Sequence, residues 1–521
     1  MARHAAPAGG RALADVLPAG VNWRTPHVMQ LNLRMFILLI GGVCMGFDSA
    51  MMNGLQDLET WKDYFNNPRS WLLGVVNAVL NLAPIVGGLP AAYLSDRFGR
   101  LLTVRLGCIM LVFASALQAG SRNLGMFVAS RFLIGIGIEL CVLSGPVLIT
   151  ELAYPKYRSQ MTSLFLSFFY VGSIIASWTI FGTSHMTGTT WSWRIPSLLQ
   201  AFVPLCQGIL SFFVAESPRW LYSKGREDEA RQIFVKYHAG GDENSALVDF
   251  EMEQIREYFE SDVENSKLKW TALWKSVADR KRLLLVVYIA FMTQVCGSAL
   301  ISYYLTLILD TIGITGTTTQ TLINAILSIV CCAVAVVGAV MVDRVGRRPM
   351  WLIAVVGMLV SFIIWTVLSA LFAQHNSAPL GRGVLTLVFL FQSFYSFGVT
   401  PLSFSYAAEV LPFHARQKGM TTVYMCNSIA LLYNNMVNPI AMDAISWKYY
   451  FVFIAMLIQW VIVIYFVFPE TKGKGLEELQ NLFEPGVIQN LTKADDLEAI
   501  DRVDTETQPK VPAAVVTEHK E

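Results

Sequence analysis

Three charged residues stand inside stretches of sequence that are otherwise apolar enough to cross a membrane. Asp48 lies in GGVCMGFDSAMMNGLQ, and both Arg131 and Glu139 lie in SRFLIGIGIELCVLSG. A charged side chain at the centre of a bilayer costs roughly 2.5–3.5 kcal/mol on insertion scales. Each of these residues therefore needs an oppositely charged partner, a water-filled cavity, or a role in moving protons or ions.

The overall composition is that of a membrane protein. Of 521 residues, 54% are hydrophobic and 15% are charged, whereas soluble domains carry about 25% charged residues. A net charge of +1 argues against the concentrated basic surface of a nucleic-acid-binding protein. The eight cysteines form no CxxC motif and no Cys/His cluster, so we expect no metal site, no disulfide framework and no cofactor.

The apolar stretches that must hold these charges form two groups of six. A bilayer core needs about 20 apolar residues per helix. The expected spans are 33–56, 72–94, 101–120, 124–149, 160–182 and 196–215 in the first group, and 283–309, 318–342, 349–373, 384–408, 418–441 and 447–468 in the second. The intervening segment carries charged stretches such as GREDEARQIF, and its periodicity predicts short helices that lie in water.

The positions of Lys and Arg predict the orientation in the membrane. Four turns between alternate spans are strongly basic: DRFGR (96–100), PKYR (155–158), DRVGRRP (343–349) and HARQKG (414–419). Basic loops stay on the cytoplasmic side, so both ends of the chain and the central segment are expected there. The predicted divisions are a tail (1–32), a six-helix half (33–215), the central segment (216–282), a second half (283–468) and a tail (469–521).

Charged motifs recur at corresponding places in the two halves. DRFGR recurs as DRVGR, a glutamate seven residues before an arginine occurs in both halves, and FVAES recurs as FVFPET. These groups could form ion pairs that close the cytoplasmic side, or they could serve only as basic anchors with a tight glycine turn. The predicted gate residues are Asp96, Arg97, Arg100, Glu151, Arg158, Glu216, Arg219, Asp343, Arg344, Arg347, Glu409, Arg416 and Glu470.

Six motifs, some of which contain these repeated charges, resemble the signatures of the sugar porter family of the major facilitator superfamily. They are LSDRFGR, ELAYPKYRSQ, AESPRWL, DRVGRRP, TPLSFSYAAEVLP and FPETKGKGLEEL, and the resemblance covers about residues 35–485. Within the family, the chain looks most similar to the fungal lactose permease-like branch. The resemblance implies an all-α membrane protein with the major facilitator fold, in which 12 transmembrane helices form two six-helix halves around a cytoplasmic helical central loop.

The resemblance also implies a role for the buried charges. Proton-coupled members of the family have an aspartate in the first helix paired with an arginine in the fourth, which here match Asp48 and Arg131. Burial disfavours a charged carboxylate and a nearby cation favours it, so movement of the arginine would switch the acid between proton uptake and release. A purely structural pair is the alternative. Glu139 departs from the family pattern, in which a small or apolar residue is expected at this position. Its possible roles are an extra proton site, a substrate-facing acid, or a second partner of Arg131.

The sugar ligands of the family are only partly matched. In TQVCGSALISYY, Gln294 and two tyrosines match, whereas Thr293 and Ala299 replace amide residues. Such losses leave fewer hydrogen-bond partners for a sugar, so the other polar residues compensate or the substrate is less hydroxylated. The asparagines of YNNMVNP either contribute to the site or shape a helix break at Pro439. The predicted substrate contacts are Gln294, Thr293, Tyr303, Tyr304, Asn427, Phe404 and Asn324.

These features together favour a secondary active transporter that takes up a sugar, either a hexose or a disaccharide, together with a proton. Its expected partners are a small-molecule substrate, protons and the lipid bilayer, and the family suggests the plasma membrane. A facilitative sugar uniporter and a proton-driven exporter of a small metabolite remain alternatives. The short acidic tail argues against a nutrient sensor. The sequence contains no nucleophile–base pair or phosphate loop, so we do not expect an enzyme.

Overall fold

The structure is a computed structural model that describes residue 18 and residues 21–69, 71–265, 276–375, 377–411 and 416–472. Within these ranges every regular element is a helix. The N-terminal half comprises α2 (Pro26–Leu55), α3 (Glu59–Tyr64), α4 (Trp71–Phe98), α5 (Arg100–Ala119), α6 (Leu124–Leu152), α7 (Arg158–Thr183) and α8 (Trp191–Leu210). Short helices follow: α9 (Pro218–Ser223), α10 (Glu227–Tyr237) and α11 (Ala246–Asn265).

The C-terminal half repeats the arrangement of long helices. It comprises α12 (Val277–Val295), α13 (Ser298–Thr311), α14 (Thr317–Val345), α15 (Arg347–His375), α16 (Ala378–Phe394), α17 (Thr400–Val410), α18 (Arg416–Ile445) and α19 (Tyr450–Val467). Eleven stretches of the described chain are long and apolar enough to cross a membrane, and one of them, Gly419–Val467, contains both α18 and α19. Twelve crossings result, which confirms the predicted fold class.

Two of the predicted spans are interrupted rather than continuous. The seventh consists of α12 and α13, which meet at Gly297, where φ is +101°. Only glycine adopts this conformation readily, so the sequence breaks the helix there. The tenth contains a π-helical turn, Tyr395–Val399, between α16 and α17. Turns of this kind are frequent at functional sites.

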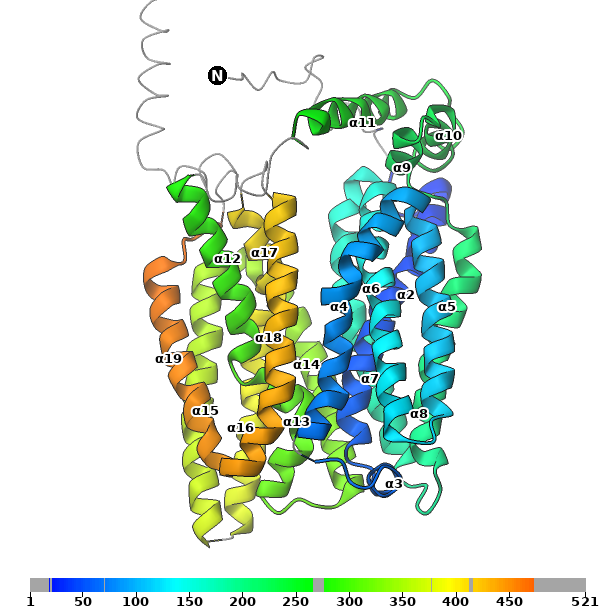
Figure 1. Cartoon of the computed structure of the whole chain (residues 1–521). Coiled ribbons are helices and arrows are strands. Elements are labelled where there is room, and N and C mark those ends of the chain that lie inside the picture. Colours follow the sequence, from blue (N-terminus) through cyan, green and yellow to red (C-terminus); the bar gives the residue numbers. More distant parts are fainter. Residues whose placement is uncertain are drawn as a thin grey trace, which may run out of the picture.

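The two halves stand side by side as separate helical bundles (Figure 1). The short helices α9, α10 and α11 lie beyond one end of the N-terminal bundle, and α3 lies at the opposite end (Figure 1). The basic turns lie at the first end, which is therefore the end expected to be cytoplasmic, and α3 lies at the end expected to be extracellular. The halves contact each other where α4 packs on α18, α7 on α14, and α2 on α13.

Close helix packing around the first span depends on glycine. The GxxxG spacing of Gly42 and Gly46 faces α7, and a Cβ atom at Gly46 would lie 1.7 Å from the backbone oxygen of Phe169. The second half has a similarly close contact between its eighth and tenth spans, because a Cβ at Gly338 of α14 would lie 2.1 Å from the backbone oxygen of Phe397. Small residues allow membrane helices to approach this closely, and this packing fixes the position of Asp48.

Replacing Gly46 by Ala is expected to destabilise the protein by about 1–3 kcal/mol, because the new methyl group must push α2 away from α7. The matched control is Gly182→Ala at the far end of α7, where no atom lies within 4 Å of the added Cβ. Thermal unfolding of the detergent-purified variants, followed by fluorescence-detected size exclusion, measures the difference. Equal melting temperatures for the two variants would contradict this account of the packing.

Candidate functional site

The predicted charged pair of the first and fourth spans is brought together in the structure. Asp48 of α2 and Arg131 of α6 are both fully buried. Nη1 of Arg131 donates to Oδ1 of Asp48. The same carboxylate oxygen accepts a second hydrogen bond from Nε2 of Gln200 in α8, at 2.7 Å. Three helices of one half therefore converge on a single carboxylate.

The other carboxylate oxygen of Asp48 has a different environment. Oδ2 is buried and has no hydrogen-bond partner within the described chain, and the same holds for Nε and Nη2 of Arg131. A buried ion pair is stable only when its remaining polar atoms are satisfied. The Asp48–Arg131 pair is incompletely satisfied, because one carboxylate oxygen and two guanidinium nitrogens lack partners in the described chain. The role of the pair in proton coupling stays a prediction.

Gln200 is a site residue that the sequence interpretation missed. It stands in SLLQAFVPLCQG, within the predicted span 196–215, and it is almost completely buried. A polar amide inside an apolar span needs a partner, and this was the available signal. The sequence could not show that the partner is Asp48, because α2 and α8 are far apart in the chain.

Tyr303 connects the charged pair to the other half of the protein. It lies on α13 and is buried, with its hydroxyl close to Ser49 and near enough to Asp48 and Arg131 to be influenced by their charges. Ser49 directly follows Asp48 in α2. A predicted substrate residue of the C-terminal half therefore lies near the buried acid of the N-terminal half.

Glu139 lies apart from this pair, farther along α6. A Cβ atom at Gly88 of α4 would lie 3.5 Å from its carboxylate oxygen, and Tyr424 of α18 is close enough to be influenced by its charge. Its side chain thus faces the region between the two halves, partly buried and without a described hydrogen-bond partner. The structure does not pair Glu139 with Arg131, and its role stays open.

Two predicted substrate residues contact each other directly across the C-terminal half. Nε2 of Gln294 on α12 donates to Oδ1 of Asn427 on α18 at 2.8 Å. Nδ2 of Asn434, one of the YNNMVNP asparagines, donates to the backbone oxygen of Gln294 at 2.8 Å. The Gln294–Asn427 pair thus brings together one amide from each of two helices, and each amide keeps further donor or acceptor capacity.

Two other predicted substrate residues join helices instead. The Tyr304 hydroxyl donates to the backbone oxygen of Asn435 at 2.6 Å, and Tyr304 is fully buried. Oδ1 of Asn324 on α14 accepts from Nδ2 of Asn53 on α2 at 3.2 Å. In this conformation Tyr304 holds α13 against α18, and Asn324 holds the C-terminal half against the N-terminal half.

The last two predicted contacts offer a ligand no unused hydrogen-bonding group. The Thr293 hydroxyl donates to the backbone oxygen of Ala290 in its own helix at 3.0 Å, and the residue is 2% exposed. Phe404 of α17 stacks on Tyr424 of α18, with ring centroids 4.8 Å apart and planes 18° apart. This aromatic pair is partly exposed and forms an apolar wall rather than a hydrogen-bonding surface.

A group that the sequence interpretation did not identify joins the two halves at the end expected to be extracellular, and we call it the extracellular latch: Asn53, Gln56 and Asp57. These residues end α2 and bind α13 of the other half. Oδ1 of Asn53 accepts from the backbone N–H of Leu305 at 3.2 Å, and Nε2 of Gln56 donates to the backbone oxygen of Tyr303 at 3.0 Å. The available signal was the polar run NGLQD at the end of an apolar span.

Asp57 is the titratable member of the extracellular latch. It is 3% exposed, lies just beyond the end of the first span, and accepts a hydrogen bond from the Thr306 hydroxyl of α13. Burial raises the pKa of Asp57 to about 7, opposed by the Thr306 hydrogen bond and by Lys62, and reinforced by Asp310. A carboxyl group at this junction therefore changes its charge within the range of external pH values.

The predicted gate residues of the N-terminal half form a compact network at the cytoplasmic end. Arg100 lies 2.9 Å from the Asp96 carboxylate and 3.4 Å from the Glu151 carboxylate. Glu216 accepts hydrogen bonds from the backbone N–H groups of Arg100 and Leu101, each at 3.1 Å. The Glu216 carboxylate thus caps the N-terminus of α5, where negative charge is favoured. Burial raises the pKa of Glu216.

The C-terminal half repeats this network. Arg347 lies 3.1 Å from the Glu409 carboxylate. Glu470 accepts hydrogen bonds from the backbone N–H groups of Arg347 and Arg348, each at 3.0 Å, and so caps α15. Although burial opposes it, these backbone donors hold the pKa of Glu470 below its usual value. The sequence repeat therefore corresponds to a repeat in three dimensions.

Other predicted gate residues contact different partners. Arg158 lies 3.7 Å from the carboxylate of Glu251 on α11, and so ties the central helices to the start of α7. The ring of His238 also contacts Glu251, with Nδ1 2.6 Å from the carboxylate. Arg97 donates to the Tyr93 hydroxyl at 2.6 Å. Arg158 thus contacts α11 rather than the DRFGR turn.

The gating role itself stays a prediction. Arg219 is partly buried and Arg344 is exposed, whereas the side chains of Asp343 and Arg416 lie outside the described residues. The ion pairs described above each stay within one half or join it to the central helices. This geometry is also the one expected of anchors that stiffen each half. Among the described residues, no group of His, Cys, Asp and Glu could hold a metal ion.

Comparisons with known proteins agree on one family. The model of the family described as "Sugar (and other) transporter" matches residues 34–483. The chain is 28% identical to the high-affinity glucose transporter of Kluyveromyces lactis over 493 residues, which are 90% of this chain and 88% of that one. It is also 28% identical over 448 residues to the MFS-type transporter criB of Aspergillus cristatus, covering 85% and 91% of the two chains.

A solved structure shows the same fold. The inward-open xylose transporter XylE from E. coli matches with a TM-score of 0.72 and 21% identity, over 87% of this chain and all of that one. The family match confirms the predicted resemblance to the sugar porters, and it makes the protein a multi-pass membrane transporter rather than an enzyme. The chain belongs to the sugar (and other) transporter family of the major facilitator superfamily.

Proposed function

We propose that this transporter takes up a sugar together with a proton by alternating access, and that Asp48 carries the proton. The observation that supports this most directly is the fully buried Asp48–Arg131 contact, which leaves one carboxylate oxygen of Asp48 without a partner. A buried ionisable group in a membrane span is costly, and a purely structural pair would be expected to satisfy both oxygens.

The same contacts suggest how sugar and proton are coupled. Tyr303, Asp48 and the extracellular latch meet where α2 and α13 hold the outside closed. When the halves separate on that side, Tyr303 moves away from Asp48 and external water reaches the carboxylate. Asp48 then takes up a proton, which weakens its attraction to Arg131. Closing the outside buries the neutral acid, and opening toward the cytoplasm lets Arg131 displace the proton.

The Gln294–Asn427 pair is the proposed centre of the sugar site. It offers an amide from each of two helices, and Phe404 and Tyr424 add an aromatic wall of the kind on which a sugar ring can pack. The names of two similar proteins support this substrate class, since one is a glucose transporter of Kluyveromyces lactis and another a xylose transporter of E. coli. Uptake of an external sugar places the protein in the plasma membrane.

Replacing Gln294 or Asn427 by Ala is expected to raise the KM for the transported sugar about two- to tenfold, the worth of one or two hydrogen bonds. The double variant should raise the KM by less than the product of the two single increases, because the two side chains contact each other. Concentration-dependent uptake of labelled sugar measures this. Thr386→Val, which removes a hydroxyl bonded within its own helix, is the control and should leave KM unchanged.

The proposed function is tested by uptake of labelled glucose, xylose, lactose and cellobiose into cells that lack their own sugar transporters. External pH is recorded while each sugar is added. Uptake accompanied by alkalinisation of the medium supports proton–sugar symport. Uptake without a pH change would identify a facilitative uniporter. If the protein reaches the surface and none of the sugars enters, sugar uptake is ruled out and export of a small metabolite becomes the hypothesis to test.

A further inference from the structure

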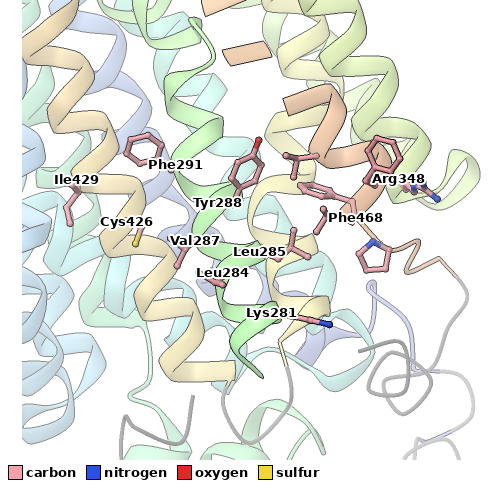
Figure 2. A pocket seen from close by; sticks show the side chains of 14 residues that line it. Lys281, Leu284, Leu285, Val287, Tyr288, Phe291, Arg348, Cys426, Ile429 and Phe468 are labelled. Carbon is pink, nitrogen blue, oxygen red and sulfur yellow. The ribbon is translucent and has the colours of Figure 1, made fainter. Parts of the chain in front are cut away.

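A large crevice opens on the C-terminal half, among helices whose exposed apolar side chains face the membrane. It has a volume of about 1010 Å³ and lies between α12, α18 and α19 (Figure 2). Its walls are mainly apolar side chains, several of them exposed, including Leu284, Phe291 and Phe466. Exposed apolar side chains on membrane-spanning helices contact lipid chains, so an acyl chain fits the walls of this crevice.

The two cationic side chains of the crevice come from the cytoplasmic ends of their helices. Lys281 is in the first turns of α12, and Arg348 is at the start of α15, next to the end of α19 (Figure 2). The Arg348 side chain is steadied by a hydrogen bond to the backbone oxygen of Tyr465 and by that residue's ring, 5.7 Å away. Two cations therefore stand at the depth where lipid headgroups lie.

Three polar groups of the crevice have hydrogen-bonding capacity to spare. The Tyr288 hydroxyl and Nε of Arg348 are buried with no partner in the described chain. Lys281 is exposed and makes no ion pair there. Two acids lie near these cations in the chain: Asp279 is 3.1 Å from Arg282, and Glu470 accepts hydrogen bonds from the backbone N–H groups of Arg347, Arg348 and Lys472 at 2.9–3.0 Å. The positive charge of the crevice therefore calls for an anion with several acceptor oxygens.

We propose that the crevice binds an anionic phospholipid of the cytoplasmic leaflet. Its phosphate would lie near Lys281 and Arg348, an ester oxygen would accept a hydrogen bond from Tyr288, and an acyl chain would lie along α12, α18 and α19. Basic pockets between membrane helices on the cytoplasmic side bind acidic headgroups, with about 1 kcal/mol per cation. Such a lipid would lie directly behind the Gln294–Asn427 pair, because Phe291 and Cys426 line the crevice.

Native mass spectrometry of the full-length protein, titrated with phosphatidylserine or phosphatidylcholine of the same chain length, tests the proposal. Phosphatidylserine is expected to bind at least fivefold more tightly. Lys281→Gln should remove about fivefold of that preference, and Tyr288→Phe should weaken binding about two- to tenfold. Lys448→Gln is the matched control, because Lys448 is exposed between α18 and α19 at their extracellular ends.

Each other outcome would overturn the proposal. Equal binding of the two lipids would show that the crevice holds acyl chains without selecting a headgroup. An unchanged phosphatidylserine preference in both Lys281→Gln and Arg348→Gln would place the anionic lipid elsewhere. A stable dimer, which the same spectra would reveal, that is lost on replacing Phe466 by Ser would assign the crevice to a second copy of the chain. None of these results bears on the identity of the transported substrate.

Discussion

Asp48→Asn is expected to abolish uptake against a concentration gradient while leaving exchange of sugar across the membrane intact. One proton that crosses with each sugar contributes about 2.3 kcal/mol per 100 mV of membrane potential, which corresponds to about fiftyfold accumulation. The amide of the variant cannot carry a proton, so the internal sugar concentration should rise only to the external concentration. Preloaded vesicles that contain the purified variant, with and without an imposed pH gradient and potential, measure both activities.

The matched comparison is Gln200→Leu, which removes the second hydrogen bond to the same carboxylate oxygen but keeps the titratable acid. This variant should still accumulate sugar, with an altered dependence of the rate on pH. Equal accumulation by the wild type and Asp48→Asn would refute the assignment of the proton site. Loss of exchange as well as accumulation would instead indicate that the pair is structural.

The sequence predicted the features that depend only on neighbouring residues, such as the length of an apolar run, a charge within it, or a repeated motif. An apolar run long enough to cross a bilayer identifies a span, and an acid within it needs a partner, a water-filled cavity or a function. The resemblance to the sugar porters then matched Asp48 with Arg131. The repeated DRxGR and glutamate motifs predicted corresponding positions in the two halves, and Glu216 and Glu470 indeed cap corresponding helices.

Features that depend on contacts between distant segments could not be predicted. Gln200 binds Asp48 from α8, and the sequence gives only a polar residue in an apolar span. Tyr304 fits the family's sugar-binding pattern, and Asn324 was expected to compensate for missing ligands. In this conformation Tyr304 binds Asn435 and Asn324 binds Asn53. The choice between a ligand and a protein partner depends on how the halves pack, which motif spacing does not encode.

The extracellular latch leads to a prediction about external pH. Asp57 contacts Thr306 of α13, and the charged groups that face it are Lys62 of α3 and Asp310 of α13. With the outside closed, burial raises the pKa of Asp57 from 3.8 to about 7. With the outside open, the carboxyl is in water and regains its ordinary value. At a pH between 3.8 and about 7, the closed form therefore binds more protons than the open form.

The sign of the effect follows from this difference. Proton binding to Asp57 stabilises the closed form relative to the open form. This stabilisation is fully present below about pH 4 and is lost as the pH rises through about 7. Between about pH 5 and pH 8 the ratio of closed to open molecules should fall on the order of 100-fold. Asp57→Asn, which is permanently neutral, should keep the outside closed at pH 8 and remove the pH dependence.

Spin labels at Glu59 and Thr318, both exposed at the extracellular ends of the two halves, can report this equilibrium in a variant without the eight native cysteines. The distance between the labels should increase with pH in the wild type and stay short in Asp57→Asn. Asp63→Asn, which neutralises an exposed acid of α3, is the control and should behave as the wild type. If Asp57→Asn opened with pH as the wild type does, another group would control the latch. Because Asp48 and Tyr303 lie beneath the latch, its closure sets when external protons can reach the proposed proton site.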